Sequence, residues 1–373
     1  MNLGIFLMPL SPPGRTMGQV MDEVTRKALL LDSVGFNEFW LGEHFSATSE
    51  AIPSPLMFMA SLLPQTRNLT FGTGVISLPN RHPAVVGAEV AQFDQMAKGR
   101  FRFGVGTGSL PSDWELFKLE DEPTRRRMML ESLAMMQAIW RQGPPYEFNG
   151  EFWQFAIAKN IHPELQMGIL PKPRSPEGPP IHVSTSTPNS STALLAGERG
   201  WGPLSSALLT PANLASHWTQ YARGLASAGR PVDGSNWRVA RTVLVAPTDA
   251  EAERRLRHPD SSVFFYYDYI RQVLMRAGKI VALKASPQMA DSEVTGESIM
   301  MSRVIYGSPQ TVRDKLIALR DSVGPFDHLL VSGMDWSGPN EEWERESLTL
   351  LGQEVWPAVR RHYAQSGQGL AAQ

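Results

Sequence analysis

The chain of 373 residues contains no cysteine. This absence excludes disulfide bonds, thiolate nucleophiles, and zinc or iron–sulfur sites held by cysteine. Long hydrophobic runs are also missing, since no stretch of about 18 apolar residues occurs anywhere. The N-terminal segment MNLGIFLMPL lacks the basic region and the long apolar core of a signal peptide. We therefore expect a soluble cytoplasmic protein with no membrane partner.

The chain also lacks a strong excess of charge of one sign. The chain has 35 basic and 37 acidic residues, and its formal net charge is −2. Nucleic-acid binding depends on a concentration of positive charge, which this composition does not supply. We therefore expect a small-molecule ligand and no nucleic acid.

Several catalytic motifs are absent. No HxH or HExxH pattern follows a predicted strand, so we expect no metal site. A GxSxG elbow of the kind found in serine hydrolases is missing too. The stretch GVGTGSLP is nearest to a dinucleotide-binding GxGxxG, but it continues into a segment without helical spacing. A built-in NADH site is therefore not expected.

The clearest pattern of secondary structure in the sequence lies between Leu69 and Gly108. Leu69–Val75 is apolar, Pro83 opens a helical stretch, and Phe101–Val105 is a second apolar run. Two strands joined by a helix form a βαβ unit and therefore a parallel sheet. Both strands end in small residues, which let a flat ligand approach the backbone at the end where parallel α/β folds bind ligands.

The same alternation of strand and helix continues along the chain. It predicts eight strands, which are residues 3–8, 39–41, 69–75, 101–105, 181–185, 202–206, 238–245 and 326–332. This count predicts an α/β (β/α)8 TIM barrel over residues 1–365, with insertions after strands four and seven. Residues 109–123 form an irregular insertion, residues 285–299 a mobile loop or lid, and residues 366–373 a disordered tail.

His44 is the first candidate for chemistry. It follows directly from the second predicted strand, so it lies at the rim where barrel active sites form. A histidine with a pKa near neutrality acts as an acid or a base. His82 and His182 are expected to be structural.

Three segments carry a family resemblance, namely DQMAKGRFRFGVGTG, the LPNRHP turn and FWLGEHF. With them the chain resembles the bacterial luciferase-like flavin monooxygenases, whose fold is a (β/α)8 barrel. The resemblance implies that a separate NAD(P)H:flavin reductase delivers reduced FMN, which reacts with O2 and forms a C4a-peroxide. This peroxide transfers one oxygen atom to the substrate.

The resemblance also assigns roles to residues of this chain. His44 matches a histidine beside the flavin, whereas Phe45 stands where many members have a second histidine. Gly74 and Val75 match a non-proline cis peptide under the flavin ring. Thr107 stands where the luciferases have an arginine that binds the flavin phosphate, and a hydroxyl brings no charge.

Other groups must then bind the phosphate. Asn189, Ser190 and Ser191 precede a helical run after the fifth strand, and free N–H groups at a helix N-terminus bind phosphate well. We therefore expect these three residues to contact the cofactor.

The whole-chain pattern, including NSSTALLAGERG, resembles most the branch of the limonene and diketocamphane monooxygenases. This implies a small hydrophobic substrate, either a terpenoid or a cyclic ketone, with epoxidation or Baeyer–Villiger lactone formation as the reaction. A deazaflavin-dependent oxidoreductase on the same fold and a non-catalytic flavin-binding protein are the alternatives. The family implies a homodimer, formed through the helices at residues 55–63 and 85–96.

Overall fold

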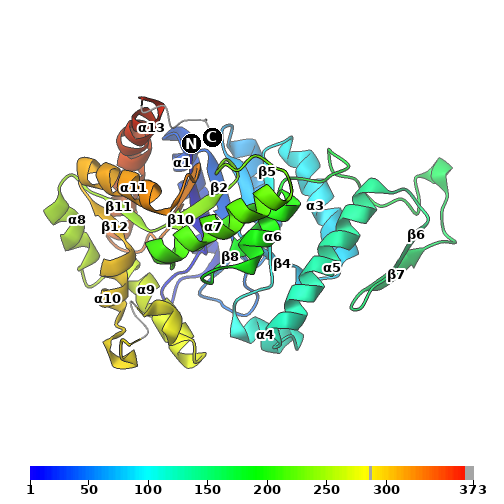
Figure 1. Cartoon of the computed structure of the whole chain (residues 1–373), viewed down its shortest axis with the longest axis horizontal. Helices are drawn as coiled ribbons and strands as arrows, with labels where there is room; N and C mark the ends of the chain where they lie inside the picture. Colours follow the sequence, from blue (N-terminus) through cyan, green and yellow to red (C-terminus); the bar gives the residue numbers. More distant parts are fainter. Residues whose placement is uncertain (285–287, 366–373) are drawn as a thin grey trace.

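A closed ring of eight parallel strands forms the centre of the computed structural model, which describes residues 1–284 and 288–365 (Figure 1). In order around the ring the strands are β1 (Asn2–Leu7), β2 (Glu38–Leu41), β3 (Thr70–Thr73), β5 (Phe101–Gly106), β8 (Ile181–Thr185), β9 (Gly202–Ser205), β10 (Arg238–Arg241) and β13 (His328–Ser332). β13 pairs with β1 and closes the ring. The predicted (β/α)8 barrel is confirmed.

Helices cover the outside of the ring. They are α1 (Met17–Ser33), α2 (Pro55–Leu62), α3 (Pro83–Ala97), α5 (Glu122–Arg141), α6 (Ser191–Arg199), α7 (Pro211–Ser227), α11 (Pro309–Val323), α12 (Asn340–Leu350) and α13 (Trp356–Gln365). Capping fixes their starts: the Thr16 side chain accepts from the Gln19 N–H of α1, and Ser308 accepts from the Thr311 N–H of α11. In the described part of the chain, no helix combines the length and hydrophobicity needed to cross a membrane.

Two insertions leave the regular alternation, where the sequence predicted them. After β5 the chain forms the short helix α4 (Pro111–Phe117) and, beyond α5, the hairpin of β6 (Tyr146–Asn149) and β7 (Gln154–Ile157). This hairpin projects from the body as an arm (Figure 1). After β10 come β11 (Val243–Val245), α8 (Asp249–Leu256), α9 (Ser262–Arg276), α10 (Gly296–Arg303) and β12 (Ile305–Gly307).

Some local predictions were wrong. The segment 109–123 is not irregular throughout, because Pro111 opens α4. The seventh strand breaks at Thr242, after which β11 leaves the ring and pairs with β12. Of the predicted lid, residues 285–287 lie outside the described residues, Asp291–Glu293 is a 3-10 turn, and residues from Gly296 onwards belong to α10. The predicted disordered tail, 366–373, also lies outside the described residues.

The interior of the ring is filled by Trp40 and by glycines that make room for it. Trp40 is completely buried. A Cβ atom added to Gly72 would lie 2.3 Å from the indole Cδ2, and one on Gly104 would lie 1.8 Å from the Thr73 carbonyl oxygen and 3.2 Å from the indole Cζ3. These two glycines therefore serve the packing of the barrel. Trp40 belongs to an interior cluster with Phe6, Leu204, Ala207, Ala240 and Leu330.

A buried ionic group lies below this cluster. The Glu38 carboxylate accepts from Trp40 Nε1 at 2.8 Å and from Arg238 Nε and Nη2 at 3.0 and 2.7 Å. His328 Nδ1 lies 3.0 Å from the same carboxylate. Burial favours the neutral acid, but Arg238 and His328 outweigh it and hold the pKa of Glu38 well below its usual range.

The helices predicted to form a dimer interface expose apolar side chains. Met57 of α2 is 77% exposed, and Val85 and Met96 of α3 are 54% and 44% exposed. The dimer itself stays a prediction.

The packing around Trp40 makes Gly72→Ala destabilising. The added methyl group would enter the indole ring, which has no free space to move into, so we expect the free energy of unfolding to fall by about 1–3 kcal/mol or more. Urea denaturation measures this change. Gly18→Ala is the matched control, because Gly18 lies in exposed α1 with no atom near its Cβ position. An equal stability of the two variants would contradict the packing described.

Candidate active site

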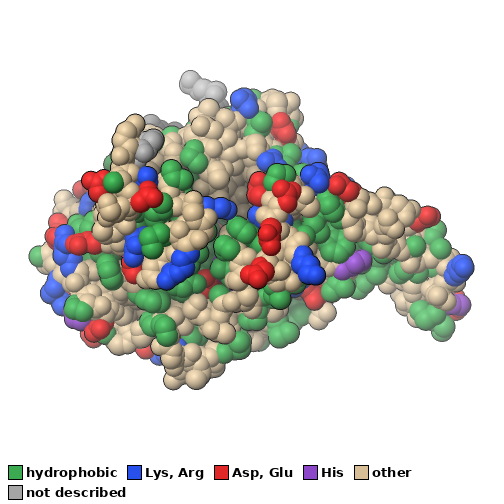
Figure 2. All heavy atoms as spheres, turned by 90° about the horizontal axis from the view of Figure 1, so that it is seen from below, with side chains coloured by type: hydrophobic (Ala, Val, Ile, Leu, Met, Phe, Trp, Pro, Cys, Tyr) green, Lys and Arg blue, Asp and Glu red, His purple; other side chains and the backbone are tan. Residues whose placement is uncertain are grey.

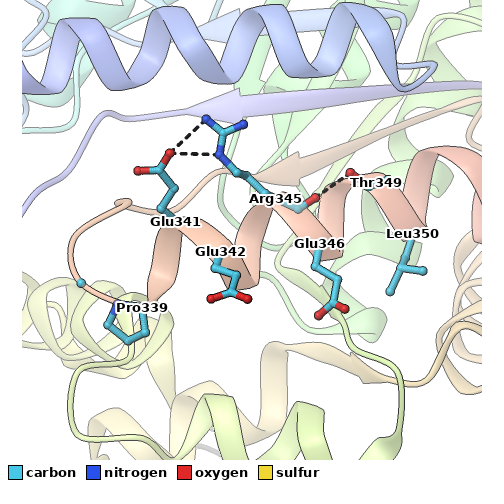
Figure 3. A pocket seen from close by; sticks show the side chains of 8 residues that line it. Pro339, Glu341, Glu342, Arg345, Glu346, Thr349 and Leu350 are labelled. Atoms are coloured by element: carbon cyan, nitrogen blue, oxygen red, sulfur yellow. Dashed lines mark hydrogen bonds and ion pairs between the residues drawn. The ribbon is translucent and has the colours of Figure 1, made fainter.

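Among the hollows formed by the described residues, two are candidates for a ligand site, and they differ in how enclosed they are. The wider one, of about 590 Å³, lies over the outer side of α12 and is lined by Glu341, Glu342, Arg345 and Glu346 (Figure 3). There Glu341 and Arg345 pair with each other at 3.0 Å, and the hollow is open to solvent. The second, of about 300 Å³, is more enclosed and contains the candidate residues, so it is the candidate active site.

The second hollow, which we call the rim cavity, lies where β1, β2, β3, β5, β8 and β9 end. Its lining includes Phe6, Leu204, Ala207, Ala240 and Leu330, which all belong to the cluster around Trp40. The C-terminal ends of strands are where barrel enzymes hold their active sites. Figure 2 shows the molecule from the side on which α4 and α9 lie in Figure 1, with apolar side chains between the charged ones.

The peptide bond between Gly74 and Val75 is cis, as predicted. It separates β3 from the short strand β4 (Ile76–Ser77), and both of its residues line the rim cavity. A Cβ atom on Gly74 would lie 2.8 Å from the Phe6 ring, and one on Gly42 would lie 2.8 Å from the Gly74 carbonyl oxygen. Close packing therefore fixes this bare stretch of backbone in the cavity wall.

His44 lines the rim cavity and is oriented by a buried carboxylate. Its Nδ1 lies 2.5 Å from Glu50 Oε2, and its Nε2 lies 3.4 Å from Ser109 Oγ. Burial disfavours the imidazolium, but the hydrogen bond and charge of Glu50, helped by Asp113 and Glu43, outweigh it and raise the pKa of His44. The side chain can therefore exchange a proton near neutral pH.

Glu43 is a second buried carboxyl group in the same wall, which sequence reasoning missed. Its oxygens accept from the Ser77 N–H at 2.8 Å and from Arg81 Nη2 at 2.9 Å. Burial raises its pKa to about 7, although Arg81 and the Ser77 N–H act in the opposite direction. The signal in the sequence was its place beside His44 after a buried strand.

Asp113 was missed too, because its segment was predicted to be irregular. Its carboxylate accepts from the backbone N–H groups of Phe45 and Ser46 at 3.1 and 2.9 Å. These bonds fix the loop that follows His44 to helix α4. Phe45, at the position of the second family histidine, packs its ring edge-to-face against Phe117 of α4.

The predicted phosphate-binding residues do not all meet in the rim cavity. Thr107 lines it, but Asn189, Ser190 and Ser191 lie at the N-terminus of α6, outside the residues that line it. Ser190 caps α6 by accepting from the Ala193 N–H, and the Asn189 N–H donates to Ser216 Oγ. Their loop begins at Ser186, which does line the cavity.

Arg126 places a positive charge beside the start of α6. This residue of α5 donates from Nη1 to Ser191 Oγ at 2.7 Å. In the described part of the chain it has no carboxylate partner, so its charge is free for a ligand at the start of α6. Sequence reasoning missed it because α5 is separated from α6 by about 50 residues, and only the fold brings the two helices together.

The comparisons with known proteins agree with this geometry. The chain is 31% identical to 4-hydroxyprotoasukamycin monooxygenase of Streptomyces nodosus subsp. asukaensis, over 95% of this chain and 91% of that protein. It is 29% identical to 2,5-diketocamphane 1,2-monooxygenase 1 of Pseudomonas putida, over 96% and 99%. The oxygenating constituent of 3,6-diketocamphane monooxygenase from Pseudomonas putida, a type II Baeyer–Villiger monooxygenase solved with FMN, superimposes with a TM-score of 0.85 at 28% identity, covering 96% of this chain and 98% of that one.

Residues 1–324 match the model of the family described as luciferase-like monooxygenase. This match covers most of the chain, and the relatives are named monooxygenases. The chain is thus an oxidoreductase of the monooxygenase class and belongs to the luciferase-like monooxygenase family.

Proposed function

We propose that this protein is the oxygenase component of a two-component system. It binds reduced FMN delivered by a separate NAD(P)H:flavin reductase and inserts one atom of O2 into a small hydrophobic substrate, a terpenoid or a cyclic ketone. The observation that carries the proposal is that His44 and the cis Gly74–Val75 peptide line one cavity at the strand ends. The FMN in the related structure and the diketocamphane substrates in the relatives' names support it.

The residues present fit a flavin. Gly74 and Val75 offer bare, closely packed backbone to a flat ring, and the apolar side chains of Met8 and Leu208 line the same cavity. For the phosphate, the free charge of Arg126 lies beside Ser191 at the N-terminus of α6, where backbone N–H groups favour an anion. Bound reduced FMN would supply the electrons that activate O2.

The protein's own part in the reaction is placement and proton transfer. The apolar floor of the cavity helps to exclude water from the reacting atoms. Glu50 orients His44, so that Nε2 is left to hold or release a proton toward the cavity. Glu43, with its pKa near 7, ties β4 to the His44 loop through the Ser77 N–H.

Arg126→Ala tests the phosphate site. We expect it to weaken the binding of reduced FMN about tenfold to a hundredfold, the range for losing a hydrogen bond to a charged group. Riboflavin, which lacks the phosphate, should bind equally well to both proteins. Anaerobic titration followed by flavin fluorescence measures both affinities.

Arg127→Ala is the matched control for this titration, since Arg127 is half exposed and pairs with Glu151. Equal FMN affinity in the Arg126 and Arg127 variants would contradict the phosphate site. A wild-type chain that ignores reduced FMN and binds a deazaflavin would overturn the proposed function. Binding of FMN without any consumption of O2 would favour a non-catalytic flavin-binding protein.

Glu50→Gln tests the role of Glu50 in setting the protonation of His44. Removing the carboxylate charge should lower the pKa of His44, as followed by NMR of its ring protons. Because the folded-state pKa is raised, Glu50 stabilises the fold below the unfolded-state pKa, and this stabilisation is lost as pH rises through the folded-state pKa. The difference in stability between wild type and variant should therefore shrink as the pH rises above the unfolded-state pKa of about 6.5.

The control is Glu198→Gln, at an exposed position near the end of α6. It should leave the titration of His44 unchanged. An unaltered His44 pKa in Glu50→Gln would show that the carboxylate does not hold the imidazolium.

A further inference from the structure

Helix α9 carries three tyrosines close together, and their hydroxyl groups have different surroundings. The Tyr267 hydroxyl donates to Thr242 Oγ1 at 2.9 Å, and the Tyr269 hydroxyl lies 3.4 Å from Ser49 Oγ. The Tyr266 hydroxyl makes no hydrogen bond to any of residues 1–284 and 288–365, and Tyr266 lines the rim cavity. None of the roles proposed above for the cavity residues uses this hydroxyl.

The Tyr266 hydroxyl keeps its proton. Burial raises its pKa above the usual range, and the neighbouring Tyr267 and the charge of Glu50 raise it further. The group is therefore a hydrogen-bond donor at any pH at which the protein works. The influence of Glu50 also places Tyr266 within electrostatic reach of the His44–Glu50 pair.

Apolar side chains line the rim cavity together with Tyr266. Ile270, one turn further along α9, is one of them, as are Leu10 and Leu208. No lysine or arginine is among the described residues that line the cavity, whereas Glu43 and Glu50 are. The positive charge that His44 can carry is already paired with Glu50. An anionic substrate would therefore find no free cation there, and an uncharged substrate needs none.

We propose that the Tyr266 hydroxyl donates a hydrogen bond to the carbonyl oxygen of the substrate, which makes a small, uncharged ketone the class of molecule that the rim cavity takes. This inference rests on the proposed function, and it narrows the substrates left open there to those that carry a carbonyl oxygen. Tyr266 acts as a specificity and positioning residue, since it holds the oxygen of the substrate in the cavity that His44 also lines.

A hydrocarbon of the same shape is the disfavoured ligand. It would displace water from the Tyr266 hydroxyl and leave that donor unpaired, which costs free energy. A ketone of the same shape replaces the water with its own acceptor oxygen. The cavity therefore discriminates by one polar atom rather than by size.

The test compares norcamphor with 2-methylenenorbornane, in which a methylene group replaces the carbonyl oxygen at nearly the same shape. Calorimetry on the full chain, saturated anaerobically with reduced FMN, gives both affinities. We expect wild type to bind the ketone at least about tenfold more tightly than the hydrocarbon. Tyr266→Phe should lose most of this preference, because it lowers the affinity for the ketone alone. Infrared difference spectra with a ¹³C-labelled carbonyl should show its stretch at lower frequency in wild type than in Tyr266→Phe.

Tyr267→Phe is the control, since it removes a hydroxyl of the same helix that bonds inside the protein. It should leave the ketone preference and the carbonyl frequency unchanged. Equal preference in wild type and Tyr266→Phe, no binding of either probe to wild type, or an effect of Tyr266→Phe on FMN alone would each overturn the inference.

Failure of the proposed function has a different signature. If wild type does not bind reduced FMN, the proposed function falls, while a ketone preference that depends on Tyr266 in the flavin-free chain would still support the inference. If reduced FMN binds normally and the two ligands are not discriminated through Tyr266, only the inference falls.

Discussion

The packing of Trp40 inside the barrel is the constraint on which the rest of the structure depends. Its indole fills the space left by Gly72 and Gly104, and its Nε1 donates to the buried carboxylate of Glu38. Glu38 in turn is held by Arg238, so the hydrophobic layer and the ionic layer below it fix each other. Removing one partner of such a buried pair leaves an uncompensated charge and costs about 3–5 kcal/mol. The strand positions, and with them the strand ends, follow from this packing.

The candidate site is built directly on that layer. Phe6 belongs to the cluster around Trp40 and also packs against Gly74, so the barrel core supports the cis peptide from below. The reactive side chains come from loops, which the fold ties to one another: Glu50 orients His44, and Asp113 fixes the loop after it. A rigid floor with polar groups on tied loops keeps catalytic groups in place while leaving the walls free to differ between relatives.

The strands that follow from the periodicity of apolar residues could be predicted from the sequence, whereas the residues that meet through loop contacts could not. Ile181–Thr185 was predicted with its observed bounds, since a run of alternating apolar residues between a proline-rich stretch and a helix cap leaves little choice. His44 and the cis peptide at Gly74 followed from strand ends and from the family resemblance. Glu50 and Arg126 could not be found this way, because each meets its partner only after the chain has folded. The break of the seventh strand at Thr242 was not visible in the sequence, because the β-forming residues of Val243–Val245 continue the pattern after it.

A crystal structure of the full chain with FMN would test the proposed flavin site most directly. We expect the flavin in the rim cavity in contact with Gly74 and Val75, and its phosphate bonded to Arg126 and to the start of α6. A flavin bound elsewhere, such as in the open hollow over α12, or a phosphate distant from Arg126, would contradict this assignment of the flavin site.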